Sequence, residues 1–203
     1  MTTLAANQAT HATLLDTLLP RATAQERLLR NVLLALVGSA ALWLSAKIQI
    51  PFWPVPMTMQ TYVVLVIGIA FGWRLGAATV LLYLTQGALG LPVFAGTPER
   101  GLGMPYMVGP TGGYLLGFIA GAALCGWLAQ RGWDRSFVRI AVAMTLGHLL
   151  ILGLGWAWLA VLTGSAARAY AVGVAPFYAA TIAKTLLAVV TVPLVWRWIG
   201  ARK

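Results

Sequence analysis

The chain has 203 residues, of which 60% are hydrophobic and 9% are charged, and its mean hydropathy is +0.84. A soluble domain carries about 25% charged residues, so the composition excludes an ordinary soluble protein and predicts an integral membrane protein. The net charge of +10 does not indicate a nucleic-acid-binding protein, because the basic residues are spread over short connections and do not gather on one polar face.

The first 30 residues differ in character from the rest of the chain. They include Asp16, Arg21 and Glu26, and they lack a continuous apolar core ending at a small-residue cleavage site, so they do not resemble a signal peptide. We expect residues 1–30 to form a cytoplasmic N-terminal extension that contains a short amphipathic or partly ordered helix. Residues 31–203 are then the transmembrane domain.

Apolar runs in this second part predict an all-α bundle of six transmembrane helices. The predicted spans are residues 31–46, 57–71, 75–89, 112–130, 137–162 and 174–199. The second and third runs have about 15 residues each, which gives about 22 Å of helix against a hydrocarbon core of about 30 Å. We therefore expect these two helices to start below the outer surface and to leave a recess there.

The basic residues orient this bundle. If the N-terminus lies inside, the cytoplasmic segments hold ten of the fourteen Lys and Arg residues and the outer segments hold three, as the positive-inside rule requires. Both termini are therefore predicted to be cytoplasmic. The ten are Arg21, Arg27, Arg30, Arg74, Arg131, Arg135, Arg139, Arg197, Arg202 and Lys203, and the three are Lys47, Arg100 and Arg168.

The segment IPFWPVPMTMQT, residues 50–61, interrupts the first two apolar runs on the predicted outer side. Its three prolines lack a backbone N–H, so the backbone groups that they release must face protein or water and not lipid. The polar residues Thr58, Gln60 and Thr61 follow the prolines. We predict that this segment is a binding loop.

The connection at residues 90–114, GLPVFAGTPERGLGMPYMVGPTGGY, is rich in glycine and proline and predicts an ordered loop or a lid. Arg100, Tyr106 and Tyr114 are its candidate ligand contacts. Thr111, followed by two glycines, would present backbone N–H groups at the start of the fourth span. An ordinary helix start explains the same run of residues equally well.

Lys184 is the one charged side chain that lies deep inside a predicted span and not near its ends, and all four acidic residues map to connections or to the extension. An ammonium group at this depth costs several kcal/mol unless it finds a partner or water. With no carboxylate in the spans, an anionic ligand is the favoured counter-ion. The alternative is a neutral lysine or one bonded to helix carbonyls. Thr181, one turn earlier, lies on the same helical face.

His148, near the middle of the fifth span, has two interpretations. Polar side chains often join membrane helices, so an interhelical hydrogen bond is the favoured one. A catalytic role would need a nucleophile or metal ligands, and the single cysteine, Cys125, together with two histidines does not supply them. The sequence also lacks a GxxxxGK[ST] phosphate loop and a buried carboxylate relay, so the chain is poorly equipped to energise transport by itself.

Small residues on the first span form neighbouring helical rows. Such spacing lets membrane helices approach each other closely. They can serve packing within the bundle or docking against a separate membrane protein, and the sequence does not choose between the two. These residues are Ala35, Gly38, Ser39, Ala41 and Ser45.

Four segments together resemble the signature of the BioY family, the biotin-binding S components of energy-coupling factor (ECF) transporters. They are IPFWPVPMTMQT at residues 50–61, YLTQGALGLPVFAG at 83–96, GPTGGYLLGF at 109–118 and PFYAATIAK at 176–184. The similarity runs from the first span to the last. The first three segments are specific in combination, although GPTGG alone would be weak.

The resemblance implies a six-helix bundle with an outward-facing biotin cavity, closed by the loops between spans one and two and between spans three and four. It implies biotin as transported ligand and no cofactor. It also implies a transmembrane T component and two cytoplasmic ATPases as partners, and it leaves a homo-oligomer open. The small residues of the first span would then resemble the surface that docks the T component. The substrate-binding candidates are Gln60, Thr61, Tyr83, Gln86, Arg100, Thr111, Tyr114, Thr181 and Lys184.

One position departs from the family pattern. The last motif usually carries an acidic residue three positions before the lysine, and this chain has Thr181 there. Lys184 matches the family's lysine, whereas the acidic contact does not carry over. Three alternatives stay open: an S component for another small anionic vitamin, a small membrane enzyme centred on His148, and a scaffold subunit without a ligand.

Overall fold

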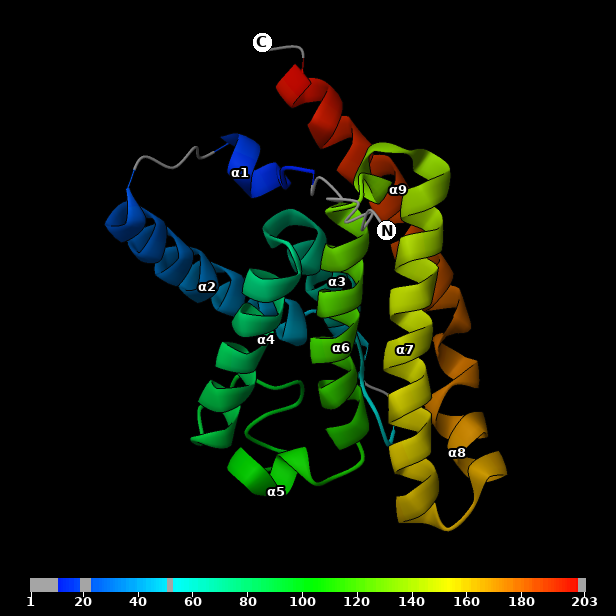
Figure 1. Cartoon of the computed structure of the whole chain (residues 1–203). Helices are drawn as coiled ribbons and strands as arrows, with labels where there is room; N and C mark the ends of the chain where they lie inside the picture. The colour runs from blue at the N-terminus through cyan, green and yellow to red at the C-terminus, as the bar shows by residue number, and fades with distance from the viewer. Residues whose placement is uncertain (1–10, 19–22, 51–52, 201–203) are drawn as a thin grey trace, which may run out of the picture.

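The computed structural model describes residues 11–18, 23–50 and 53–200, and most of them are helical (Figure 1). The elements in chain order are α1 (Leu14–Leu18), α2 (Ala24–Lys47), β1 (Gln49–Ile50), β2 (Met57–Thr58), α3 (Gln60–Phe71), α4 (Trp73–Ala88), α5 (Gly103–Met107), α6 (Gly112–Ala129), η1 (Trp133–Arg135), α7 (Phe137–Thr163), α8 (Ala166–Gly173), η2 (Ala175–Phe177) and α9 (Tyr178–Gly200).

Four helical stretches among the described residues are long and apolar enough to cross a membrane, which makes the chain a membrane protein. They are α2, α6, α7 and the stretch Ala166–Ile199, in which α8, η2 and most of α9 follow one another. The predicted second and third spans are the short helices α3 and α4, of 12 and 16 residues. The expectation that these two are shorter than a full span is confirmed.

The first long helix begins at Ala24, inside the region expected to be the extension. Thr23 accepts a hydrogen bond from the Glu26 backbone N–H through its side chain, and the Glu26 carboxylate accepts one from the Thr23 backbone N–H. These two hydrogen bonds form a capping box. The helix can therefore begin among charged residues, which hydropathy does not identify as part of a span. The short helix α1 lies beside it, where Asp16 and Arg30 approach to 3.6 Å. Arg21 lies outside the described residues.

The proline segment is the turn of a small β-hairpin. Its strands β1 and β2 pair antiparallel, with Gln49 opposite Thr58. The helix that was expected to start at Met57 therefore starts at Gln60. Residues 51–52 lie outside the described part of the chain.

Helix α6 occupies the centre of the bundle, where it packs against α3, α4 and α7. Close approach depends on glycine: a Cβ atom at Gly68 of α3 would lie 2.2 Å from the Ala122 carbonyl oxygen of α6. The chain then turns sharply into α4 at Gly72, whose φ of +80° favours glycine. The Gly68 contact brings α3 directly against α6.

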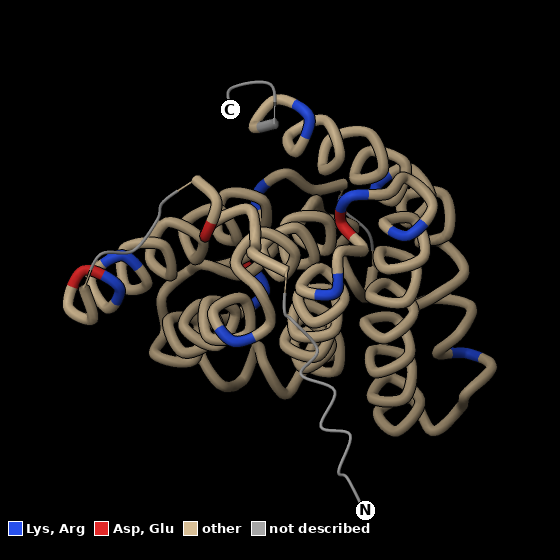
Figure 2. The backbone as a smooth tube through the Cα atoms, turned by 45° about the horizontal axis from the view of Figure 1, so that its top comes forward, with Lys and Arg blue, Asp and Glu red and all other residues tan. Residues whose placement is uncertain are grey.

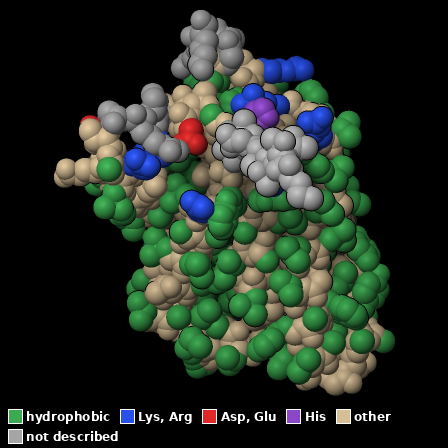
Figure 3. All heavy atoms as spheres, in the orientation of Figure 1, with side chains coloured by type: hydrophobic (Ala, Val, Ile, Leu, Met, Phe, Trp, Pro, Cys, Tyr) green, Lys and Arg blue, Asp and Glu red, His purple; other side chains and the backbone are tan. Residues whose placement is uncertain are grey.

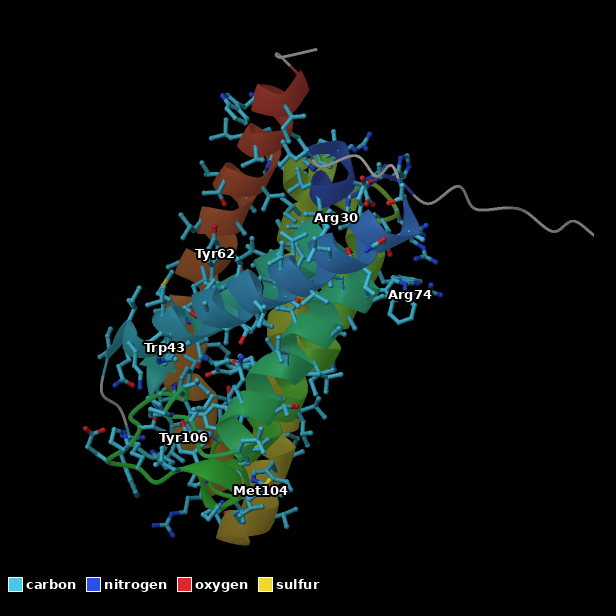
Figure 4. The ribbon with its side chains drawn as sticks, turned by 90° about the vertical axis from the view of Figure 1, so that its left-hand side faces the viewer. Arg30, Trp43, Tyr62, Arg74, Met104 and Tyr106 are labelled. Atoms are coloured by element: carbon cyan, nitrogen blue, oxygen red, sulfur yellow. The ribbon has the colours of Figure 1, made fainter. Side chains whose placement is uncertain are left out.

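Helix α2 lies obliquely across α3 and α4 and exposes a wide apolar surface (Figure 4). Arg30 and Arg74 lie at one end of the molecule, and Met104 and Tyr106 lie toward the other (Figure 4). The end with α1 and the C-terminus of α9 carries most of the basic residues, whereas the end with α5 carries few (Figures 1 and 2). On the face shown in Figure 3, charged side chains gather at this basic end and hydrophobic ones cover the rest.

Candidate functional site

A cavity lies between α3, α6, α7 and α9, toward the end of the bundle that carries α5. Its walls enclose about 590 Å³, which includes its mouth. Apolar and aromatic side chains dominate the lining, and among the described residues that line it there is no Asp or Glu. The lining residues are Val55, Pro56, Thr58, Gln60, Thr61, Ala95, Tyr106, Thr111, Tyr114, Leu115, Phe118, His148, Ile151, Leu152, Phe177, Thr181 and Lys184.

Lys184 supplies the positive charge of this cavity. Its side chain is 7% exposed, and its Nζ donates hydrogen bonds to the Thr58 carbonyl oxygen at 2.6 Å and to Thr61 Oγ1 at 3.0 Å. Both acceptors are neutral, so the ammonium is solvated by the hairpin and by the first turn of α3 but is not paired with an anion. Thr181 lines the same cavity one helical turn earlier, as predicted.

Gln60 begins α3 at the cavity wall and is held from behind by Tyr83 of α4. The Gln60 Nε2 atom donates to the Tyr83 hydroxyl at 2.7 Å and to the Leu42 carbonyl oxygen at 3.4 Å. The Tyr83 hydroxyl in turn donates to the Val93 carbonyl oxygen at 2.9 Å. Tyr83 is fully buried and does not line the cavity, so it positions Gln60 instead of reaching the cavity itself.

Two other predicted binding residues lie away from the cavity. Gln86 of α4 accepts a hydrogen bond from Ser39 of α2. Arg100 donates to the Pro54 carbonyl oxygen at 3.2 Å and lies over the Trp53 ring, 5.5 Å from its centroid. Arg100 lines a separate outer pocket that shares Tyr106 and Thr111 with the main cavity. It therefore lies on the approach to the cavity.

Aromatic side chains form the outer part of the cavity. The Tyr106 hydroxyl donates to the Ala95 carbonyl oxygen at 2.9 Å, and its ring stacks on Phe94 with centroids 4.8 Å apart. Burial raises the pKa of this hydroxyl, so it remains a hydrogen-bond donor. Tyr114 anchors the start of α6 in the same way, because its hydroxyl donates to the Gly173 carbonyl oxygen at 2.7 Å.

His148 of α7 completes the inner wall. It is 2% exposed, and its Nδ1 lies 3.3 Å from Thr185 Oγ1 of α9. This contact is the interhelical hydrogen bond that the sequence favoured. Its other ring nitrogen, Nε2, is buried and has no hydrogen-bond partner among the described residues. No group of three or more His, Cys, Asp or Glu side chains in the described part of the chain is placed to hold a metal ion.

The apolar lining of the cavity was not predicted residue by residue. Phe118, Leu115 and Phe177 lie in the two motifs that had been singled out for their polar residues. Ile151 and Leu152 carry no signal of their own, because residues 149–155 are all apolar or glycine. The position of His148 beside them was the available signal, since a polar side chain within such a run marks the face that turns inward.

The small residues of α2 have two different environments. Ser39 and Ser45 are buried within the chain, so packing inside the bundle is what the structure shows for them. Gly38 is also buried, next to Thr79 and Phe71. Ala35 and Ala41 are only half-buried. Docking of a partner protein on α2 stays a prediction, which now rests on Ala35 and Ala41.

A sequence model described as the BioY family matches residues 12–201. The chain belongs to the BioY family. Two curated members of the family show how close the match is. The probable biotin transporter BioY of Pyrococcus horikoshii is 37% identical over 145 residues, which are 71% of this chain and 83% of that protein. The biotin transporter BioY of Thermotoga maritima is 36% identical over 149 residues, 73% of this chain and 85% of that protein.

The fold also has a solved counterpart. The crystal structure of an S-component for biotin from an ECF-type ABC transporter superposes with a TM-score of 0.74, over 87% of this chain and 95% of that chain. The sequence identity in this pair is 22%. The BioY resemblance inferred from the four motifs is therefore confirmed by the family match, and the fold is that of an S component.

Proposed function

We propose that this chain is the biotin-binding S component of an ECF-type transporter and takes up biotin across the cytoplasmic membrane. One observation supports this most: a buried lysine, Lys184, faces an apolar cavity without an acidic side chain, in a chain of the BioY family. Biotin carries one carboxylate on an apolar chain and a polar ring system. An anion of this kind would neutralise the ammonium while its apolar part fills the aromatic walls.

The proposed arrangement has six spans with both termini in the cytoplasm. The spans would be α2, α3, α4, α6, α7 and the α8–α9 stretch, with the short helices α3 and α4 completed by the hairpin and by the loop that contains α5. The concentration of basic residues at the end with both described termini supports this orientation (Figure 2). The cavity then opens toward the outer side, under these two loops.

The binding residues that we propose follow from the geometry. Gln60, Thr61, Thr111, Tyr114, Thr181 and Lys184 would contact the ligand, because they line the cavity. Tyr83 and Gln86 would support the cavity wall without lining it, and Arg100 would contact the ligand at the outer pocket. No cofactor and no covalent step is needed. A T component and two ATPases would supply the energy, and self-association stays open in this proposal.

Equilibrium binding of radiolabelled biotin to the full chain purified in detergent tests the proposal. We expect saturable binding with nanomolar affinity that excess unlabelled biotin abolishes and that excess nicotinate or pantothenate leaves intact. Absence of saturable biotin binding would overturn the proposal, and displacement by another anionic vitamin would favour the alternative S component. Uptake into cells with and without co-expressed T component and ATPases then tests the partners.

A further inference from the structure

His148 has one feature that the interhelical hydrogen bond does not explain. The imidazole is buried at the cavity wall, and its Nδ1 lies 3.3 Å from Thr185 Oγ1. Nε2 has no partner among the described residues. A buried polar atom without a partner costs about 1–3 kcal/mol, so a structural role alone would leave the site incompletely satisfied.

His148 borders two spaces from which Nε2 could receive a hydrogen-bond partner. One is an outer groove between α7 and α9, lined by the apolar side chains of Leu149, Leu152, Ile182 and Leu186 and by the hydroxyl-bearing side chains of Thr145, Tyr178, Thr181 and Thr185. Three of the apolar residues are exposed on the outer surface of the bundle, where lipid chains lie and offer no hydrogen bond. None of the side chains that line this groove is bonded to Nε2, and His148 also lines the main cavity, where a bound ligand can supply the partner.

The bonded side of the ring is Nδ1, and we place the ring proton there, because Thr185 Oγ1 beside it can accept a hydrogen bond. A neutral imidazole has a single N–H, which leaves a lone pair on Nε2. His148 thus presents an acceptor to the cavity. The Lys184 ammonium and the threonine hydroxyls supply donors, and the same cavity wall has no carboxylate among the described residues.

We propose that Nε2 of His148 accepts a hydrogen bond from a ureido N–H of the bound ligand, which makes His148 a specificity-determining residue of the site. This inference rests on the proposed function, because it takes the ligand to be biotin. The two ureido N–H groups of biotin need acceptors when they leave water. His148 of α7 and Lys184 of α9 line the same cavity, so in this proposal the ligand presents its N–H to the acceptor at one end and its carboxylate to the ammonium at the other.

The test combines changes in the protein with changes in the ligand. The variant His148→Asn keeps an amide near the position of Nδ1 and has no atom at the position of Nε2. Binding of biotin is compared with binding of two analogues in which one or the other ureido nitrogen is methylated. In the parent chain, we expect one of the two methyl groups to weaken binding by at least about 30-fold, since it removes the N–H and leaves Nε2 unpaired.

For His148→Asn we expect biotin to bind about 10- to 100-fold more weakly. In this variant we expect the loss of affinity caused by that methyl group to be about tenfold smaller, because the acceptor atom that methylation leaves unpaired is absent. His148→Gln places an amide group near the position of Nε2, and we expect it to bind biotin within about fivefold of the parent. A role confined to helix packing would not produce this pattern.

The control is Thr145→Val on the same helix. Thr145 Oγ1 donates only to the Ala141 carbonyl oxygen of its own helix, at 2.8 Å, and Thr145 does not line the main cavity. We expect parent-like binding of biotin and of both analogues. Thermal unfolding without ligand is recorded for each variant. If His148→Asn does not fold, the same ligand comparison is made with His148→Gln and His148→Leu.

The inference and the proposed function fail separately. Absence of biotin binding in the parent chain would overturn the proposed function and with it this inference. If the parent binds biotin but the methyl penalty is the same in His148→Asn, His148 has only a structural role and the inference alone is wrong. Equal weakening by Thr185→Val and His148→Asn with an unchanged methyl penalty would lead to the same conclusion.

Discussion

The two sides of the cavity differ in how far their polar groups satisfy one another. On the α4 side, Gln60, Tyr83 and the Val93 carbonyl form a closed chain of hydrogen bonds. On the α7 and α9 side, among the residues that the structure describes, Lys184 has only neutral acceptors and one ring nitrogen of His148 has no partner. Buried polar groups that bond one another contribute to the stability of the fold, whereas buried polar groups without a protein partner can bond a ligand. Removing residues from the two sides should therefore change different properties.

The largest effect is expected at Lys184. In Lys184→Ala the ligand carboxylate would enter the cavity without a cation, and loss of one partner of a buried charge pair costs about 2–5 kcal/mol. We expect biotin affinity to fall by about 100-fold or more. The ligand-free unfolding temperature should change little, because loss of the hydrogen bonds to Thr58 and Thr61 is offset by removal of a buried ammonium without a counter-ion in the described part of the chain. Equilibrium binding and thermal unfolding of the same preparations measure both.

Arg168→Ala is the control for charge. Arg168 is an exposed residue of α8 and lines none of the described pockets near the site. The variant loses the same unit of charge on the same predicted side of the membrane, and we expect parent-like affinity. Equal affinity of Lys184→Ala and the parent would contradict the assignment of Lys184 as the ligand's counter-ion.

The opposite pattern is expected on the α4 side. Tyr83→Phe removes the hydroxyl that joins Gln60 to the Val93 carbonyl, leaving buried polar groups unpaired at a cost of about 1–3 kcal/mol. We expect a lower unfolding temperature and a loss of biotin affinity of less than about tenfold, the affinity that corresponds to 1.4 kcal/mol. Tyr170→Phe, at an exposed tyrosine, is the matched control. A larger loss of affinity than of stability would show that Tyr83 contacts the ligand.

Ser39→Ala tests the same distinction further from the cavity. Ser39 donates to Gln86 between α2 and α4, so we expect a loss of about 1 kcal/mol in stability and no change in the amount of T component that copurifies. Ser45→Ala should cost less, since Ser45 donates only to the Leu42 carbonyl of its own helix, at 2.8 Å. Loss of copurification in Ser39→Ala alone would contradict the internal role of this serine.

The smallest effect is expected at Asp134, an incompletely satisfied group at the basic end. Asp134 Oδ2 accepts a hydrogen bond from Trp196 Nε1 at 2.7 Å, and Oδ1 has no partner among the described residues. Burial raises the pKa of this carboxyl above its ordinary range. Because the folded state favours the protonated form, this group's contribution to stability falls as the pH rises through the folded-state pKa.

Asp134→Asn removes this titration. We expect the variant to be more stable than the parent at pH 8, by up to about 1 kcal/mol, and the difference to shrink toward pH 4. Thermal unfolding between these values measures it. Asp16→Asn, which alters a carboxylate paired with Arg30 at 3.6 Å, serves as the control and should not gain stability at pH 8. A constant difference at every pH would contradict the titration of Asp134.

Hydropathy and charge predicted the long helices because membrane insertion depends on exactly those two properties of a segment, summed over many residues. The hairpin was not predicted, since strands of two residues carry no periodic signal and the three prolines indicate only a loop. The early start of α2 was missed for a related reason. Its first turn is charged, and a capping box, not hydrophobicity, sets its beginning.

The candidate site divides in the same way. Lys184 was predictable from energetics, because an unpaired charge within a span demands an explanation. Gln86 and Arg100 were placed with it, but sequence spacing does not say which helical face turns toward the cavity, and both lie elsewhere. His148 was assigned one hydrogen bond correctly. Its second nitrogen became informative only when the surrounding partners were known.

The contacts of Lys184 limit how it can hold an anion. An ammonium group has three N–H donors, and two of them are directed at the Thr58 carbonyl and Thr61 Oγ1. A single donor remains for a carboxylate as long as the hairpin stays in place. A bound anion would therefore be held through one oxygen, by a point charge anchored to the loop above it. A planar guanidinium at this position, which binds carboxylates through two parallel bonds, would have to abandon that anchor.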